Sequence, residues 1–202
     1  IFSSNWNNYE DTKECLESLE KITYPNYDVI VVDNGSTDGS GKRLSRKFSQ
    51  YEFLFNPENL GYVGGNNEGI NKAISHEAKY VYILNNDIVI KETPIFPLVT
   101  AMEKDPMIGM AGGTIYYYKS PNIIDTAGEC INFYTGIIHS MGRGEVENKE
   151  FNTDKEPREV DYICGAAIPI RAKVLKEIGG FDKRFFFSAE DADFCLRARI
   201  KG

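Results

Sequence analysis

The first part of the chain alternates between two patterns of apolar residues. Between residues 9 and 22, apolar side chains recur every three or four positions, which predicts an amphipathic helix capped by Asp11 or Thr12. Residues 28–33 form a short apolar run that ends in Asp33 and is followed by Asn-Gly-Ser. Such a run is typical of a buried parallel strand that stops at a loop. The start of the chain therefore predicts a helix followed by a buried strand.

The alternation continues as far as residue 87. We expect helices at about 40–49 and through 70–74, and strands at 52–55 and 80–84. Strands that alternate with helices form a mainly parallel sheet with helices packed on its faces. The fold class predicted for this part of the chain is therefore α/β.

The pattern changes in the second half of the chain. Residues 108–139 are rich in Gly, Tyr and β-branched residues, which predicts short strands and hairpins in a smaller, mixed or antiparallel portion. Residues 145–158 are polar and predict a surface loop. Helical patterns return at 171–178, where two glycines end the helix, and again from about residue 190.

Length and composition fit one globular domain. Of the 202 residues, 42% are hydrophobic and 26% are charged, which excludes disordered, collagen-like and coiled-coil proteins. The sequence shows no repeat or linker, so we expect a single domain over residues 1–202. The first residue is not Met, and we expect the chain to be truncated at both ends.

The net charge bears on which partners the protein binds, and the cysteines bear on whether it holds zinc or disulfides. The formal net charge is −7 and long runs of Lys or Arg are lacking, so the sequence predicts no nucleic-acid partner. The four cysteines are scattered and predict buried thiols rather than a zinc site or disulfides. No apolar run reaches the ~18 residues of a membrane span. We expect a cytoplasmic protein, and a place at the inner face of the membrane is compatible with this.

Acidic residues follow two of the predicted strands. Asp33 ends the first buried strand, Asp87 follows the strand at 80–84, and a third acidic cluster, Glu190–Asp193, comes after an aromatic run. Ligands of open α/β sheets bind at the carboxyl ends of the strands, so these acids are candidates for one site. Each also has a structural interpretation: a turn at Asp33, a solvated strand end at Asp87, and a helix N-terminus at the third cluster.

Residues 59–69 contain four glycines directly before a predicted helix. A glycine-rich loop at this point would let backbone amides approach a phosphate group. The segment lacks both the Gly-Lys-Ser/Thr of a Walker loop and the spacing of a dinucleotide-binding fingerprint. We therefore expect a glycine-rich loop that matches neither of these two motifs.

In their order along the chain, these segments resemble the family 2 glycosyltransferases, which bind nucleotide sugars with the GT-A fold. The segments that carry the resemblance are Val31–Asp38, Asn59–Gly61 with Asn66–Gly69, Leu84–Asp87, Gly165–Ala167 with Arg171, Gly179–Asp182, and Glu190–Asp193 with Arg197. The Asn-Asn-Asp and Glu-Asp-Ala-Asp sequences are similar to those of a rhamnosyltransferase-like subgroup. The resemblance implies a nucleotide-sugar-binding half at 1–105 and an acceptor-side half at 106–202.

The resemblance also implies roles for residues on the donor side. Asp33 would hydrogen-bond the nucleotide base, and Asn5 would flank the base or the ribose. Asp87 is the only carboxylate at the position of the family's D-x-D motif and would bind Mg²⁺ or Mn²⁺. The other residues expected at the nucleotide are Asn34, Gly35, Gly61, Gly65, Asn66 and Asn86.

On the acceptor side, Asp191 matches the catalytic base of the family, and Glu190 would support it. The residues expected to contact the acceptor are Gly165, Phe187 and Asp193. Aromatic runs are more often part of a core than of a sugar site, and both interpretations of residues 185–187 remain open.

Some features depart from the family pattern. Many relatives carry an arginine near Gly65 that meets the diphosphate, and its absence here would leave more of the phosphate charge to the metal. His76 and His139 lie at no matching position, and we interpret them as structural or surface residues.

The resemblance implies an inverting transfer of a sugar, with rhamnose as one candidate, from a nucleotide-diphosphate donor to a hydroxyl group. The acceptor would be a saccharide or a lipid-linked saccharide in polysaccharide or glycan biosynthesis, and peripheral membrane association is compatible with it. A positioned carboxylate that takes the hydroxyl proton contributes about 10²–10⁴-fold to the rate. Alternatively, the chain is a non-catalytic nucleotide-sugar-binding module or a subunit of a larger assembly, which would bind donor without turnover.

Overall fold

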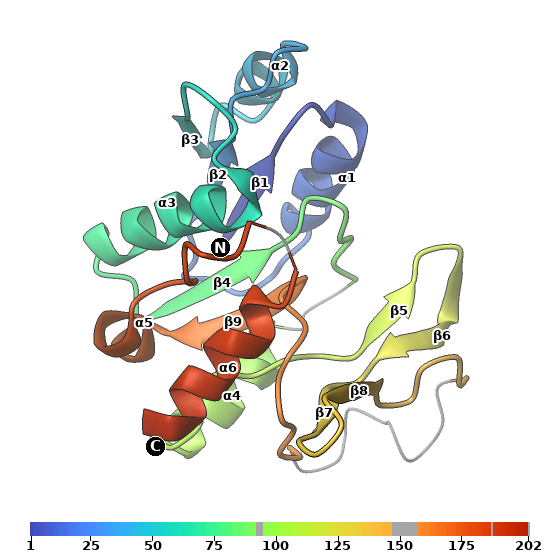
Figure 1. Cartoon of the computed structure of the whole chain (residues 1–202). Helices are drawn as coiled ribbons and strands as arrows, with labels where there is room; N and C mark the ends of the chain where they lie inside the picture. The colour runs from blue at the N-terminus through green and yellow to red at the C-terminus, as the bar shows by residue number, and fades with distance from the viewer. Residues whose placement is uncertain (92–94, 147–156, 187, 202) are drawn as a thin grey trace.

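A five-stranded sheet forms the centre of the computed structural model, which describes residues 1–91, 95–146, 157–186 and 188–201 (Figure 1). Its strands, in spatial order, are β3 (Glu52–Phe55), β2 (Ile30–Asp33), β1 (Phe2–Asn5), β4 (Tyr80–Leu84) and β9 (Ala167–Arg171). The first four run parallel to one another, and β9 is antiparallel to β4. The sheet is thus mainly parallel, as the sequence predicted.

The register of the sheet brings polar strand ends to one edge. Asn5 pairs with Asp33, and Asp33 pairs with Phe55, so that β1, β2 and β3 end level with one another. Because β9 runs in the opposite direction, its first residue, Ala167, pairs with Leu84, the last residue of β4. We call this edge, where β1 to β4 end and β9 begins, the carboxyl edge.

Helices cover both faces of the sheet. They are α1 (Tyr9–Leu19), α2 (Ser40–Lys47), α3 (Gly61–Ser75), α4 (Ile95–Lys104), α5 (Ala172–Ile178) and α6 (Glu190–Lys201). One apolar cluster joins strand residues such as Ile83 to α3, α5 and α6, and a second joins neighbours such as Leu84 to α1, α2 and α4. Alternate strand residues therefore supply two core layers, and each large buried side chain contributes roughly 1.5–3 kcal/mol. Among the described helices, none is both long and apolar enough for a membrane span.

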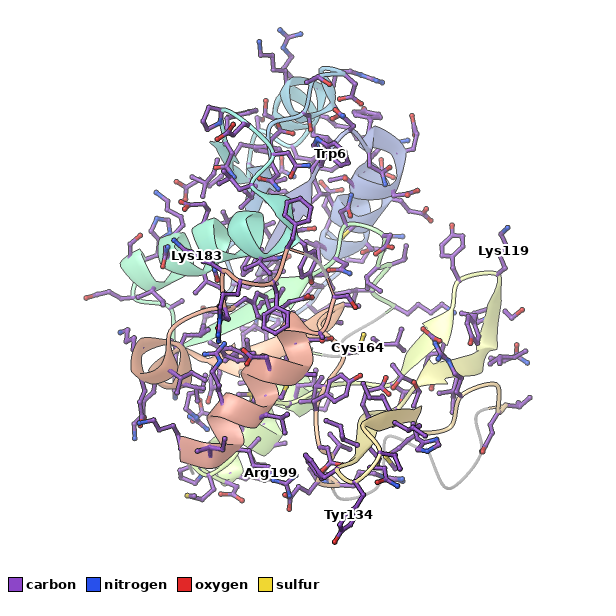
Figure 2. The ribbon with its side chains drawn as sticks, viewed as in Figure 1. Trp6, Lys119, Tyr134, Cys164, Lys183 and Arg199 are labelled. Atoms are coloured by element: carbon purple, nitrogen blue, oxygen red, sulfur yellow. The ribbon has the colours of Figure 1, made fainter. Side chains whose placement is uncertain are left out.

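A small lobe stands beside the main body (Figure 1). It consists of two antiparallel pairs: β5 (Ile115–Tyr117) with β6 (Ser120–Thr126), and β7 (Glu129–Asn132) with β8 (Ile137–Ser140). Lys119 and Tyr134, at the turns of the two pairs, lie far apart at the ends of the lobe (Figure 2). The short strands and hairpins expected at 108–139 are confirmed, whereas most of the loop expected at 145–158 lies outside the described residues.

The glycine-rich segment is the amino-terminal part of α3 and not a loop, so that prediction is wrong. The helix begins at Gly61 and contains all four glycines. A Cβ atom on Gly69 would lie 2.5 Å from the ring of Phe2, and one on Gly65 would lie 2.9 Å from Nδ2 of Asn34. The glycines therefore let α3 pack closely on β1 and on the turn after β2.

Other boundaries differ for identifiable reasons. Asn8 caps α1, because its side chain accepts a hydrogen bond from the backbone amide of Asp11, so the caps predicted at Asp11 and Thr12 are wrong. The sequence did not predict α4 or β9. Cys15 and Cys195 are buried free thiols, as expected, and Cys130 and Cys164 are partly buried.

Candidate active site

A cavity opens at the carboxyl edge between the ends of α3 and α6. We call it the Asp191 cavity; its walls include Tyr62, Asn85, Tyr162, Gly165, Glu190 and Asp191. These residues come from α3, from the segment after β4, from the segment before β9 and from the first turn of α6. Figure 2 shows Cys164, which also lines the cavity, near the amino-terminal end of α6.

Asp191 is held by two backbone amides. The N–H of Gly165 donates to Oδ2 at 2.9 Å, and the N–H of Ala192 donates to Oδ1 at 2.8 Å. Asp191 also lies in the first turn of α6, where the helix dipole favours negative charge. Hydrogen bonds to a carboxylate stabilise its charged form and fix its direction. Asp191 is thus an oriented carboxylate on a cavity wall.

Glu190, the residue before it, is in a different environment. It is 5% exposed, and its Oε2 atom has no hydrogen-bond partner within the described residues. Burial raises the pKa of Glu190, and the negative charge of Asp191 adds to the effect. The preceding residues Ser188 and Ala189 have φ angles of 76° and 66°, a strained conformation for residues other than glycine. The backbone is therefore strained where it delivers two adjacent carboxyl groups to the cavity.

Tyr62 lies between the two sides of the cavity. Its hydroxyl donates to Oδ1 of Asn85 at 2.9 Å and approaches the carbonyl oxygen of Gly165 at 3.3 Å. Burial raises the pKa of Tyr62, and the negative charges of Glu190, Asp191 and Asp87 raise it further. The hydroxyl consequently stays protonated. Asp87 and the two acids of α6 thus all act on the charge of one buried hydroxyl group.

Asp87 is the residue available for a metal ion. It is exposed, two residues beyond Asn85. Within the described ranges, no three His, Cys, Asp or Glu side chains come close enough together to hold an ion on their own. Magnesium is often bound by one or two carboxylates together with substrate phosphates. The described residues fit that arrangement, with Asp87 as the protein ligand, better than a cage made of protein ligands alone.

Asp33 lies in a second cavity along the same edge, lined also by Gly41, Lys42 and Phe55. Its Oδ1 accepts from Nδ2 of Asn5 at 2.7 Å, and its Oδ2 accepts from the amide of Ser36 at 3.3 Å. A Cβ atom on Gly41 would overlap the carboxylate, so α2 packs directly on it. We call this space the Asp33 cavity.

A chain of hydrogen bonds joins the two cavities. Oγ1 of Thr12 donates to Oδ1 of Asn5 at 2.9 Å, and Nδ2 of Asn86 donates to Oγ1 of Thr12 at 2.8 Å. Asn86 stands between Asn85, on the wall of the Asp191 cavity, and Asp87. The three predicted acids therefore lie along one edge, with Asp87 and Asp191 near Tyr62 and Asp33 in a neighbouring space.

Three asparagines expected at the nucleotide serve the fold instead. Asn5 is fully buried, and its amide group bonds within the protein to Asp33, Ser36, Ser40 and Thr12. Asn34 is 4% exposed, and it donates to Asn59 and Gly61 and accepts from Asn56 and Leu60. Asn66 is 2% exposed and donates to the carbonyl of Tyr62. These side chains shape the carboxyl edge without being open to a ligand.

The glycines expected at the nucleotide also have packing roles. Gly35 has a φ of 72°, and a Cβ atom there would overlap the backbone of Glu58. Gly61 also has a φ of 72° and lies under the exposed ring of Phe186. These conformations and close approaches require glycine.

The residues expected at the acceptor also differ in where they lie. Gly165 lines the Asp191 cavity, and its contact with the acceptor stays a prediction. Asp193 forms an ion pair with Arg197 at 2.7 Å and does not line the cavity, so its predicted acceptor contact is not supported. Arg197 in turn donates to the carbonyls of Ile178 and Gly180, which closes the turn after α5. Phe187 lies outside the described residues.

Sequence reasoning missed Tyr62 and Tyr162 on the cavity wall. Tyr62 was placed in a loop, and the usable signal was its position in the first turn of a helix that begins at the carboxyl edge. Of the two histidines, His76 lies 3.5 Å from Glu52, and His139 is exposed on β8 next to Ile138, which lines the Asp191 cavity; neither histidine itself lines a cavity.

Comparison with known proteins defines the class to which this fold and site belong. Residues 1–179 match the family described as Glycosyl transferase family 2. The chain therefore belongs to the family 2 glycosyltransferases.

Two curated relatives align over most of the chain. The low-salt glycan biosynthesis hexosyltransferase Agl10 of Haloferax volcanii is 27% identical over 98% of this chain and 61% of its own length. The N-acetylglucosaminyl-diphospho-decaprenol L-rhamnosyltransferase of Mycobacterium tuberculosis is 24% identical over 88% of this chain and 62% of its own length. The chain thus spans about three-fifths of these relatives.

Solved structures establish the fold. The mannosyltransferase PcManGT from Pyrobaculum calidifontis, in complex with GDP-Man and Mn²⁺, has a TM-score of 0.62 at 17% identity, over all of this chain and 51% of that one. GalNAc-T7 with UDP, GalNAc and Mn²⁺ has a TM-score of 0.76 at 14% identity, over 98% of this chain and 39% of that one. The predicted GT-A fold is confirmed.

Proposed function

We propose that this chain is the catalytic domain of an inverting glycosyltransferase. It moves a sugar from a nucleotide-diphosphate donor to a hydroxyl group of a saccharide in glycan or polysaccharide biosynthesis. The observation that carries the proposal is Asp191, a carboxylate fixed by two backbone amides on the wall of a cavity at the carboxyl edge, where Asp87 follows the end of β4.

The donor lies along the carboxyl edge. Its base enters the Asp33 cavity, where the carboxylate is oriented by Asn5 and Ser36 to accept an N–H of the base. Its diphosphate extends past Asn86 toward Asp87. Asp87 would hold a divalent cation, Mg²⁺ or Mn²⁺, which when bound would neutralise charge on the leaving group.

Asp191 acts as the general base. The acceptor hydroxyl gives its proton to the Asp191 carboxylate while its oxygen forms a bond to the anomeric carbon. The bond from that carbon to the diphosphate oxygen breaks, and the nucleoside diphosphate leaves with the electron pair. Attack on the face opposite the leaving group inverts the anomeric centre.

The relatives suggest which substrates to try first. One is named a hexosyltransferase and one a rhamnosyltransferase that uses a lipid-linked saccharide, so hexose and rhamnose donors and a polyprenyl-linked acceptor are the leading candidates.

The test combines binding with turnover. Thermal unfolding of the full-length protein is measured with UDP-, TDP- and GDP-sugars, with and without Mn²⁺, and stabilisation by one donor identifies the nucleotide. Transfer from that donor to a panel of saccharide acceptors is then followed by release of the nucleoside diphosphate. Metal-dependent transfer that requires Asp191 supports the proposal, and donor binding without transfer or hydrolysis supports a non-catalytic binding module instead.

A further inference from the structure

We propose that Tyr62 is a positioning residue, which couples the end of β4 to the segment that holds Asp191. The inference rests on the proposed role of Asp191 and assigns Tyr62 no contact with substrate. The inference is based on the Tyr62 hydroxyl, which bridges two segments. One is the end of β4, which leads to Asp87, and the other is the segment before β9, which holds Asp191.

The bridge joins residues that are distant in sequence. The Tyr62 hydroxyl reaches Oδ1 of Asn85, 23 positions away, at 2.9 Å, and the carbonyl of Gly165, 103 positions away, at 3.3 Å. Both atoms are acceptors, so the single hydroxyl hydrogen is shared between them. The buried hydroxyl remains protonated because its surroundings disfavour the charged form.

Gly165 is the residue through which this bridge reaches Asp191. Its carbonyl faces Tyr62, while its own N–H donates to Asp191. The next carbonyl, that of Ala166, accepts from the amide of Asn85 at 2.8 Å. The segment before β9 is therefore tied to the end of β4 by one backbone bond and by the Tyr62 hydroxyl, and it carries Asp191 on its other side.

The rest of Tyr62 is anchored independently of its hydroxyl. Its ring lies 6.3 Å from that of Phe181, centroid to centroid, and its backbone carbonyl accepts from the side chain of Asn66 at 2.8 Å. Substitution by Phe should therefore leave α3 and the core in place. What it removes is the shared hydrogen, so Gly165 loses one of its restraints and Asp191 becomes less well oriented.

Small errors in the placement of a catalytic group have large kinetic effects. A displacement of about 1 Å can lower the rate on the order of 100-fold. For Tyr62→Phe we expect kcat to fall about 10- to 100-fold with the KM for donor nearly unchanged, because the Asp33 cavity is untouched. Asn85→Ala should have a similar effect, and the double variant should be no worse than the more severe single one.

The experiment measures two independent quantities in the full chain. The first is the pair kcat and KM for the donor identified by thermal unfolding. The second is native-state hydrogen exchange of the Gly165 amide, read by NMR without any substrate. Tyr27→Phe is the matched control, because the Tyr27 hydroxyl donates to a backbone carbonyl, that of Leu19, at 3.0 Å, far from both cavities.

The expected result is faster exchange of the Gly165 amide and a lower kcat in Tyr62→Phe, with neither change in Tyr27→Phe. Wild-type exchange at Gly165 in Tyr62→Phe overturns the inference, whatever the activity. Faster exchange with an unchanged kcat also overturns it, since the contact would then be structural only. A wild-type protein that binds donor but never transfers refutes the proposed function, and the exchange measurement then shows whether the coupling exists.

Discussion

The backbone amide of Gly165 donates a hydrogen bond to Oδ2 of Asp191, 26 positions further along the chain, at a distance of 2.9 Å. A Cβ atom on Gly165 would lie 3.1 Å from Cβ of Asp191 and 3.3 Å from that oxygen. A side chain at this position would crowd Asp191, so the absence of a Cβ atom lets the segment approach the carboxylate closely.

Gly165→Ala tests this approach. The added methyl group would push Asp191 by a few tenths of an ångström, and we expect turnover to fall about tenfold or more with donor binding unchanged. Steady-state kinetics and donor thermal shifts measure the two effects. Gly113→Ala is the control, since a Cβ atom there meets nothing within 4 Å. Equal turnover of the two variants would contradict the positioning role.

Asp191→Asn removes the proposed base while keeping its shape. Turnover should fall about 10²–10⁴-fold, because the acceptor hydroxyl keeps its proton, while the donor still stabilises the protein. The control is Asp193→Asn, which breaks the ion pair with Arg197 on the same helix and should lower stability by roughly 0.2–1 kcal/mol. Full turnover by Asp191→Asn would show that another group takes the proton.

Asp87→Asn tests the metal site. Without this carboxylate, added Mn²⁺ should no longer increase the stabilisation that the donor gives, because the ion has lost its proposed protein ligand. Thermal unfolding with donor, at several Mn²⁺ concentrations, measures the loss. Asp105→Asn, which changes an acid beyond the end of α4, should respond as the wild type does. An unchanged response to Mn²⁺ in Asp87→Asn would place the ion elsewhere.

Gly41→Ala tests the Asp33 cavity. The new methyl group would overlap the Asp33 carboxylate, so we expect a loss of donor binding together with about 1–3 kcal/mol of destabilisation from overpacking. Calorimetric titration with the nucleoside diphosphate measures the affinity. Ser45→Ala, at a half-buried position of the same helix that does not line the Asp33 cavity, provides the control. Wild-type affinity in a folded Gly41→Ala protein would remove Asp33 from the binding site.

Glu190→Gln tests the effect of burial on the pKa of Glu190. Because that pKa is raised in the folded state, the carboxyl group stabilises the fold at low pH, and this contribution is lost as the pH rises through the folded-state pKa. Relative to wild type, the variant should be more stable at about pH 7 and similar near pH 4. A tenfold change in the proton affinity of the carboxyl group on folding corresponds to about 1.4 kcal/mol of stability.

Denaturant unfolding across this pH range measures the difference. Glu177→Gln, which changes an exposed residue of α5, should show the pH dependence of the wild type. A pH dependence of Glu190→Gln identical to that of the wild type would mean that the Glu190 carboxyl is solvated in the folded protein.

Local patterns were enough to predict much of the sheet. The strands at 52–55 and 80–84 have the predicted bounds, because each is a short apolar or aromatic run followed directly by polar residues. The α/β fold followed from the alternation of strands and helices, and the GT-A fold followed from the resemblance of the ordered segments to a known family. That Asp33 and Asp87 lie at one edge followed from strands that are succeeded by acids, and the role of Asp191 came from the resemblance. β9 was not predicted because a short segment that contains a proline lacks the usual pattern of a strand. Its pairing with β4 also depends on residues that are distant in sequence.

The roles of the polar residues were harder to predict. Asn5, Asn34 and Asn66 lie in segments that resemble a ligand-binding family, yet their side chains are buried and bonded within the protein. A sequence shows that an asparagine is present but not whether its amide faces a ligand or a neighbouring turn. Tyr62 was overlooked for the converse reason, since its two partners come from segments far away in the chain.

The antiparallel pairing of β9 with β4 determines where the chain returns to the sheet after the small lobe. All five residues of β9 pair with β4, so the chain that passes through the small lobe is brought back to the end of β4 at Ala167. The hairpins of this segment reach the Asp191 cavity, because Ile138 of β8 lies on its wall and the backbone of Glu129 in β7 bonds to that of Tyr162, another wall residue. A changed hairpin would therefore reshape part of the cavity wall, while the pairing of β9 with β4 keeps the segment that holds Asp191 in place.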